Sequence, residues 1–443
     1  MRKMSEATKT RCDCGDARCP LEIERVMKND FVEPESSEIP VRSMAQRKIR
    51  WLNRTVLGIG LASLFSDTSH EMATTIMPAF LATMGVAAAW LGLIEGVSDG
   101  LSSFAKLASG YYTDHLQRRK PVAILGYALT TLGVAAFGLA TAAWQVLVLR
   151  ATAWFGRGIR TPVRKALLAA AVNREAYGRA FGFERMMDTL GAIIAPALVW
   201  FLLPALHHHY ANLFAFTLVP GALAISVIAV LVKEKERAPV PHISFGSRLR
   251  ALPGAYRQFL VAVGLFGAGA FAHTMLILLA TQKLTPTLGA TRAASAAVAL
   301  YLLHNVFYAS FALIGGWIAD RVKKNIVLAV GYSMAALMAI AIIALPASIW
   351  TFVLIFILGG TNVALEETAE DSFCAELVRE EHHGVAFGML ATVNGIGDFL
   401  SSVIVGLLWT AFGTTIAFSY SAILSIAGTL LVARISNPRT SLP

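Results

Sequence analysis

The sequence predicts an all-α integral membrane protein in which twelve transmembrane helices form two pseudo-symmetric six-helix bundles. Three observations lead to this prediction. Hydrophobic residues make up 56% of the 443-residue chain and charged residues only 15%, well below the share usual in soluble domains. Twelve apolar runs are each long enough to cross a bilayer as a helix. The second half of the chain repeats the first at a constant offset of 206 residues.

The apolar runs divide the chain into two sets of six. The predicted spans are residues 52–82, 90–111, 121–142, 144–171, 178–205, 211–232, 258–280, 293–319, 325–346, 349–375, 384–410 and 414–433. The predicted parts are a disordered cytoplasmic tail at 1–50, an N-terminal six-helix bundle at 51–232, a cytoplasmic linker at 233–257, a C-terminal six-helix bundle at 258–433 and a cytoplasmic tail at 434–443.

Basic residues indicate which side of the membrane each loop faces. Lysine and arginine cluster before the first span and after spans 2, 6, 8 and 12, whereas the opposite loops at 83–89, 204–212, 346–349 and 410–414 have none. Positive charges stay on the cytoplasmic side, so both termini are predicted to be cytoplasmic. The predicted location is the plasma membrane. The net charge of +10 is therefore a topology and lipid-headgroup signal rather than a sign of nucleic-acid binding.

The first and second spans carry acidic side chains that are costly at bilayer depth. Asp67, His70 and Glu71 are spaced i, i+3, i+4 and so share one helical face. Asp67 lies about 20 Å along its helix, inside the hydrocarbon, where a carboxylic acid can exchange a proton near neutral pH. We take Asp67, Glu71 and Asp99 as candidate proton carriers. The alternative for the aspartates is a structural bond to an arginine on a neighbouring helix.

The loop after the second span contains a motif that recurs after the eighth. Its residues in the two copies are Gly110, Asp114, Arg118, Arg119, Gly316, Asp320 and Arg321. The motif resembles the loop signature of the major facilitator superfamily, Gly-x-x-x-Asp-Arg/Lys-x-Gly-Arg-Arg/Lys, with departures at His115 and Gln117. Its glycine permits close helix contact, and its aspartate can cap the amides of the next helix. The resemblance implies two six-helix bundles that move a small molecule by alternating access.

Spans 4 and 5 hold an unusual number of charges for an apolar hairpin. By the resemblance, spans 1, 4, 5, 7, 8, 10 and 11 line the cavity. The candidate cavity residues are His70, Arg150, Arg157, Glu184, Arg185, Asp188, His273, His304, Asn305, Asn394 and Asp398. We expect Glu184 and Asp188 to form a network with Arg157, Arg150 or Arg185. In span 5, Gly191-x-x-x-Ala195-Pro196 partly resembles a signature of the family's exporters, which favours export.

The offset of 206 residues predicts a gate at the cytoplasmic side. It places three cations of span 4 over three acids of span 10. The predicted pairs are Arg160–Glu366, Arg164–Glu370 and Lys165–Asp371. Pairs of this kind suit a switch that closes in the outward-open state and breaks in the inward-open state. The alternative is a set of independent, solvated charges.

The sequence contains no nucleophile elbow, ATP-binding loop or metalloprotease helix, so we predict neither an enzyme nor a cofactor. Cys12, Cys14 and Cys19 and the histidines at 207–209 could bind metal, but incidental residues are the favoured interpretation.

The prediction is a monomeric, proton-coupled secondary transporter in contact with membrane lipids, with efflux of a drug or metabolite favoured. The alternatives are an organic-anion carrier that uses the cavity arginines, a copper-type metal transporter, and a membrane sensor on a transporter fold.

Overall fold

The computed structural model describes residues 51–84, 88–207, 209–234, 252–271 and 273–435. The predicted N-terminal tail with its three cysteines, most of the predicted linker and the residues after 435 lie outside this part of the chain. Residues from Ile49 onward belong to one compact unit. The description below concerns that unit.

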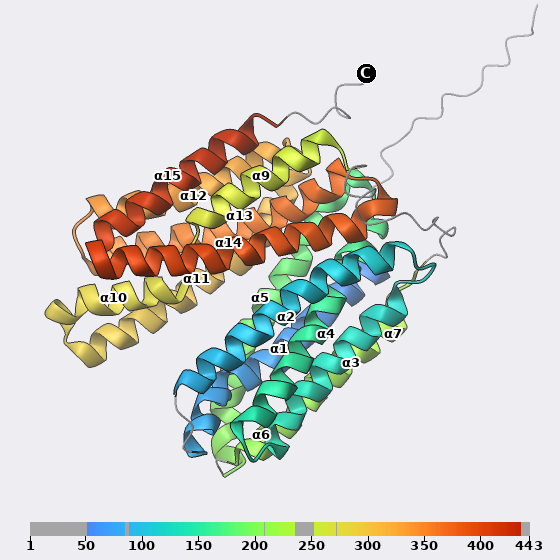
Figure 1. Cartoon of the computed structure of the whole chain (residues 1–443), viewed down its shortest axis with the longest axis horizontal. Coiled ribbons are helices and arrows are strands. Elements are labelled where there is room, and N and C mark those ends of the chain that lie inside the picture. Colours follow the sequence, from blue (N-terminus) through green and yellow to red (C-terminus); the bar gives the residue numbers. More distant parts are fainter. Residues whose placement is uncertain (1–50, 85–87, 208, 235–251, 272, 436–443) are drawn as a thin grey trace, which may run out of the picture. The chain divides into compact units, whose positions relative to one another are not determined.

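Helices of the first half form one bundle (Figure 1). They are α1 (Arg54–Thr83), α2 (Ala88–Asp114), α3 (Lys120–Ala135), η1 (Ala136–Leu139), α4 (Ala143–Ala170), η2 (Arg174–Ala176), α5 (Tyr177–Ala205), α6 (Tyr210–Phe216) and α7 (Leu218–Leu231). Helices of the second half form the other bundle. They are α9 (Gly254–Gly269), α10 (His273–Leu288), α11 (Ala290–Ala319), α12 (Lys324–Ala344), α13 (Ile349–Leu377), η3 (Glu380–His382), α14 (His383–Phe412) and α15 (Thr414–Ala433).

Each predicted span overlaps one or two of these helices, and eight helical segments within the described residues are long and apolar enough to cross a membrane. Three predicted spans are not single α-helices. The third ends in η1, the sixth is divided into α6 and α7, and the seventh is divided into α9 and α10. The break in the sixth follows from Pro220, which lies in the first turn of α7, where a missing N–H costs no helical hydrogen bond.

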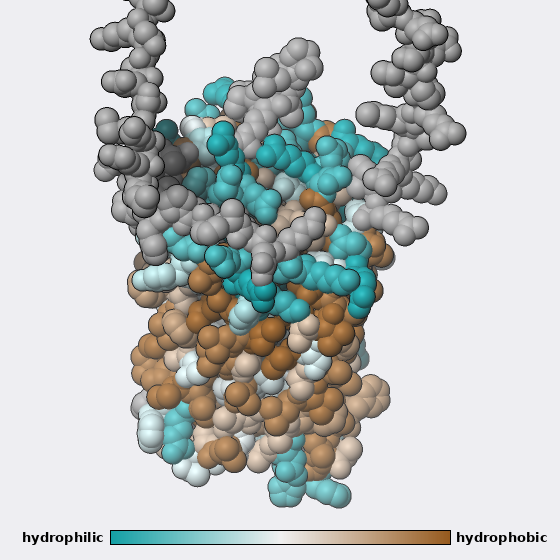
Figure 2. Space-filling model, turned by 90° about the vertical axis from the view of Figure 1, so that its right-hand side faces the viewer, coloured by the Kyte–Doolittle hydropathy of each residue, from teal (hydrophilic) through white to brown (hydrophobic). Residues whose placement is uncertain are grey.

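The outer surface is that of a protein in lipid. Figure 2 shows a broad band of hydrophobic residues on one face, with hydrophilic residues gathered mainly at one end. Large apolar side chains are widely exposed, including Trp200 (71%) and Trp350 (78%). Such exposure is costly in water but favourable in hydrocarbon, where the helices satisfy their own backbone hydrogen bonds.

The two bundles meet along two helix pairs, α2 with α14 and α5 with α11. Glycines make both contacts close. A Cβ atom on Gly110 would lie 2.3 Å from the carbonyl oxygen of Gly384, and one on Gly178 would lie 2.2 Å from that of Gly316. Both contacts would therefore be blocked by any side chain. Gly110 is equivalent to Gly316, and Gly384 to Gly178, so a pseudo-twofold axis relates the two contacts.

Candidate functional site

A histidine of α1 lies between two carboxyl groups and a guanidinium group. The ring of His70 is buried, with Nδ1 3.4 Å from Asp67 and Nε2 3.1 Å from Glu71. The same Nε2 lies 3.1 Å from Nη1 of Arg157 on α4. A protonated Nε2 can donate to Glu71, whereas an unprotonated Nε2 can accept from Arg157. The protonation state of His70 therefore decides which neighbour it binds.

Trp154 of α4 joins this cluster, although it was not among the predicted site residues. Its indole Nε1 donates to Asp99 of α2 at 2.8 Å, and its ring lies 3.5 Å from the guanidinium carbon of Arg150. Arg150 also donates to Thr74 of α1 at 3.1 Å. Among the residues that the structure describes, Asp99 is thus bonded to an indole and not to an arginine. Its place in the sequence could have identified it, because Trp154 is one turn from Arg150 and from Arg157 on the same helix.

A second polar cluster ties α4 to α1 and α5. Arg164 lies 2.6 Å from Glu184 and 3.5 Å from Asp188, and it donates to Ser63 at 2.6 Å. Ser63 in turn donates to Glu184 at 2.9 Å, and Glu184 is only 1% exposed. Of the three arginines expected in this network, Arg185 is present and lies 3.2 Å from Asp188. Arg157 and Arg150 instead contact His70 and Thr74 of α1. Arg164, which was not expected here, binds both acids.

Arg185 of α5 connects the first bundle to the second. It lies 3.2 Å from Asp188 of its own helix, 2.9 Å from Glu367 of α13 and 3.8 Å from Asp371 of α13. Glu367 also accepts a hydrogen bond from the hydroxyl of Tyr308 on α11. Through Arg185, the carboxylate network of the first bundle is therefore continuous with acidic groups of the second.

One of the three predicted gate pairs is present. Lys165 of α4 lies 2.6 Å from Asp371 of α13, and both side chains are buried. The pairs Arg160–Glu366 and Arg164–Glu370 are not formed. Both arginines turn into their own bundle, where polar partners from α1 and α5 are closer.

Arg160 illustrates this choice of partner. It donates to the hydroxyl of Ser66 on α1, and its guanidinium carbon lies 4.2 Å from the ring centroid of Tyr127. The opposite side chain, Glu366, makes no ion pair or hydrogen bond with any residue that the structure describes. Span 10 therefore carries acids that the cations of span 4 do not neutralise.

Lys165 and Asp371 are 206 positions apart, so each touches its own equivalent in the other half. Two aromatic contacts have the same property: Tyr177 with His383, with ring centroids 6.5 Å apart, and Phe181 with Phe387, 5.7 Å apart. Residues that touch their equivalents lie on the pseudo-twofold axis. These three pairs form a column between the ends of α4, α5, α13 and α14, which we call the axial column.

The loop-motif aspartate of the first half caps a helix of the second. Asp114 accepts hydrogen bonds from the backbone N–H groups of Gly384 and Val385, both at 2.9 Å, at the start of α14. It also binds Arg119 at 2.5 Å. The expectation that Asp114 caps the next helix is therefore wrong, because the close contact of α2 with α14 brings other free amides nearer.

The second copy makes the equivalent contact. Asp320 accepts from the N–H groups of Gly178 (2.7 Å) and Arg179 (3.1 Å) at the start of α5, and its carboxylate binds the Arg179 side chain. Arg321 instead lies over the ring of Trp317, and Arg118 is exposed. The two aspartates thus link the bundles at matching places.

The remaining predicted cavity residues whose side chains the structure describes lie on helices of the second bundle, apart from the cluster on α1 and α4. His304 is buried on α11, and Asn305 donates to a backbone carbonyl one turn earlier on that helix. Asp398 is exposed on α14, whereas Asn394 donates to a glutamate of α13. The side chain of His273 lies outside the described part of the structure. The second bundle therefore has a different polar arrangement from the first.

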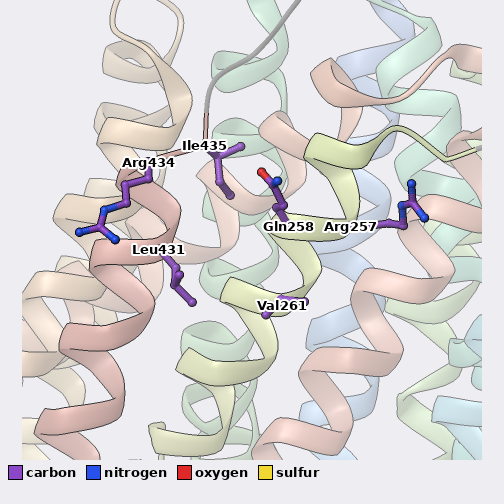
Figure 3. Close-up of a pocket in the computed structure, with 6 residues that line it drawn as sticks. All are labelled: Arg257, Gln258, Val261, Leu431, Arg434 and Ile435. Carbon is purple, nitrogen blue, oxygen red and sulfur yellow. The ribbon is translucent and has the colours of Figure 1, made fainter.

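A groove of about 330 Å³ lies between α9 and α15 (Figure 3). Its lining residues are Arg257, Gln258, Val261, Leu431, Arg434 and Ile435. None of the predicted site residues lines it. The charged clusters described above, and not this groove, carry the functional argument.

Comparisons with known proteins agree with this architecture. The sequence model of the Major Facilitator Superfamily matches residues 59–282 and 261–442. An uncharacterised MFS-type transporter of Methanocaldococcus jannaschii is 27% identical over 399 residues, which are 88% of this chain and 99% of that protein. A human organic anion transporter has a TM-score of 0.70 at 16% identity, over 86% and 99% of the two chains. The transporter FucP, solved in the outward conformation, has a TM-score of 0.70 at 14% identity, over 86% and 98%.

Proposed function

Because this chain belongs to the Major Facilitator Superfamily and is therefore a membrane transporter and not an enzyme, we propose that it exports a small molecule in exchange for protons. The observation that carries the proposal is the shared Nε2 atom of His70. One atom faces both a carboxylate of its own helix and a guanidinium group of α4. A proton taken up here changes the bonding between two helices.

The exchange of partners gives a coupling step. When His70 is protonated, its Nε2–H donates to Glu71 and repels Arg157. When His70 is neutral with Nε2 unprotonated, Arg157 donates to it. Asp67 lies 3.4 Å from the other ring nitrogen, so a carboxyl group lies beside each nitrogen of the ring. Proton binding on α1 thereby breaks or forms a hydrogen bond to α4. The same helix carries Lys165 of the axial column.

The position of the inter-bundle contacts supports alternating access. The axial column and the two aspartate caps join the bundles on the side that the basic loops assign to the cytoplasm. We assign this conformation to the outward-open state, in keeping with its similarity to a transporter solved in the outward conformation. Opening to the cytoplasm, where an exporter loads its substrate, then requires these contacts to break.

The exporter-like motif of α5 supports the proposed direction. A Cβ atom on Gly191 would lie 2.5 Å from the carbonyl oxygen of Leu64 and 3.0 Å from Cβ of Asp67. The glycine lets α5 lie directly against the part of α1 that carries the proposed proton site. A movement of α5 therefore also displaces the part of α1 that carries Asp67.

Arg157 favours a second candidate, the carriage of an organic anion. This side chain is half-buried, and no carboxylate among the described residues lies within ion-pair distance of it. A guanidinium group in that state can bind a carboxylate or phosphate through two parallel hydrogen bonds. An anionic substrate would then compete with His70 for the same guanidinium.

Substrate-driven proton movement in proteoliposomes tests both candidates. With an internal pH dye and a panel of ethidium, fluorescein and copper ions, we expect proton flux with one class of probe. Asp67→Asn is expected to reduce that flux by about tenfold or more, equivalent to a barrier increase above ~1.4 kcal/mol. Glu381→Gln, an exposed change in η3, is the matched control. Probe movement without proton flux, unchanged in Asp67→Asn, would overturn the coupling proposal.

A further inference from the structure

Glu370 of α13 is a buried carboxyl group held only by neutral donors. Its side chain is 2% exposed. The hydroxyl of Tyr332 on α12 donates to one oxygen, and the amide of Asn394 on α14 donates to the other at 2.7 Å. Within the described part of the chain, no cation lies within ion-pair distance of Glu370. An ionised carboxylate in such a place is costly unless something neutralises it.

The internal repeat shows that the missing partner is specific to the second half. Residues equivalent to Glu370 and Asn394 in the first half are Arg164 and Asp188. Those two side chains also touch, with Nη1 of Arg164 3.5 Å from Asp188. The duplicated contact is therefore kept, but its ion pair is replaced by an acid and an amide. The second half therefore lacks the positive charge that Arg164 supplies in the first half.

A second acid lies one turn away. Glu366 precedes Glu370 by four residues on α13, so the two share a helical face. Glu366 is half-buried and makes no ion pair or hydrogen bond with any described residue. The two carboxyl groups interact electrostatically, and like charges this close in a membrane interior oppose simultaneous ionisation.

The two cations near the pair are already engaged. The charged groups around the pair are Lys165 on α4, Arg185 on α5, Glu367 and Asp371 on α13, and Asp398 on α14. Lys165 is bound to Asp371 at 2.6 Å. Arg185 is bound to Glu367 at 2.9 Å and to an aspartate of its own helix. Asp398 adds a further negative charge. A proton is then the remaining way to neutralise the pair.

We propose that Glu366 and Glu370 together hold one proton in this conformation and so form a second proton-binding site, in the second bundle. Tyr332 and Asn394 fix the carboxyl of Glu370 and supply no charge of their own. The occupancy of this site does not depend on the α1 cluster. Its use in transport rests on the proposed function: when the ends of α4 and α13 separate, water from the cytoplasm reaches the pair and the proton leaves.

Infrared spectroscopy tests the occupancy directly, without a substrate. The full-length protein in lipid nanodiscs at neutral pH is expected to show the C=O stretching band of a protonated carboxyl group. The double variant Glu366→Gln/Glu370→Gln is expected to lose intensity equal to one carboxyl group per chain. Glu370→Gln alone is expected to lose the same intensity and to keep the wild-type melting temperature, because the amide resembles the neutral acid. Full intensity in the double variant would overturn the proposal, whereas full intensity in Glu370→Gln alone would place the shared proton on Glu366.

A control on the same helix separates a local effect from a general one. Glu376 of α13 is paired with Lys324 of α12 at 2.7 Å, so Glu376→Gln is expected to leave the band unchanged. The result is independent of the liposome assay. If the band depends on Glu370 but no probe drives proton flux, the proposed function fails and the proton site stands.

Discussion

Replacement of Arg164 by methionine is expected to destabilise the protein by about 3–5 kcal/mol, because it leaves the buried carboxyl group of Glu184 without its cation. Arg164 is 2.6 Å from Glu184 and 3.5 Å from Asp188, and all three side chains are buried. Arg185 can still neutralise Asp188 at 3.2 Å, so the cost falls mainly on Glu184. Thermal unfolding in detergent measures the effect as a lower melting temperature.

A second variant shows whether the cost comes from the unpaired charge. In Arg164→Met/Glu184→Met the buried charge is removed along with its partner, and most of the lost stability is expected to return. Arg174→Met, an exposed change in η2, is the control and is expected to melt as the wild type does. Equal melting of Arg164→Met and wild type would show that the network contributes nothing to stability.

Much of the fold could be predicted because each span is indicated by the residues within it. Apolar runs give the spans, and one offset aligns Gly110 with Gly316 and Gly178 with Gly384. The structure places those glycines in two equivalent contacts. Local spacing was equally reliable: Asp67, His70 and Glu71 share a face because they lie within one helical turn. Such inferences need only helix geometry.

Partner choice between helices was less predictable. The repeat identifies equivalent positions, but it does not say which way a long side chain turns. Arg160 and Arg164 turn toward Ser66 and Glu184, which belong to helices of their own bundle. The cap of Asp114 was assigned to the wrong helix for a related reason, since nothing in the sequence shows that α14 begins beside α2. Each of these outcomes is decided by distance in three dimensions.

Lys165→Asp and Asp371→Lys are each expected to reduce transport by about tenfold or more, and the double variant is expected to recover much of that loss. Lys165 and Asp371 lie 2.6 Å apart at equivalent positions on the pseudo-twofold axis. Exchanging the two charges therefore returns nearly the same pair, turned about the axis. Recovery is expected to be partial, because Arg185, now 3.8 Å from Asp371, would then face a lysine.

Each single variant is expected to shift the balance between the outward-open and inward-open states, without changing how the substrate is bound. A like-charge pair on the axis opposes the cytoplasmic contact, so spin labels on the ends of α4 and α13 should report longer distances in each single variant and a return toward the wild-type distance in the double. Exchange of Lys324 and Glu376, paired at 2.7 Å within the second bundle, is the matched control and should leave that distance unchanged. If the double variant transports no better than either single, the pair is not a gate, and the closure of the cytoplasmic side must then rest on the aromatic pairs and the two aspartate caps.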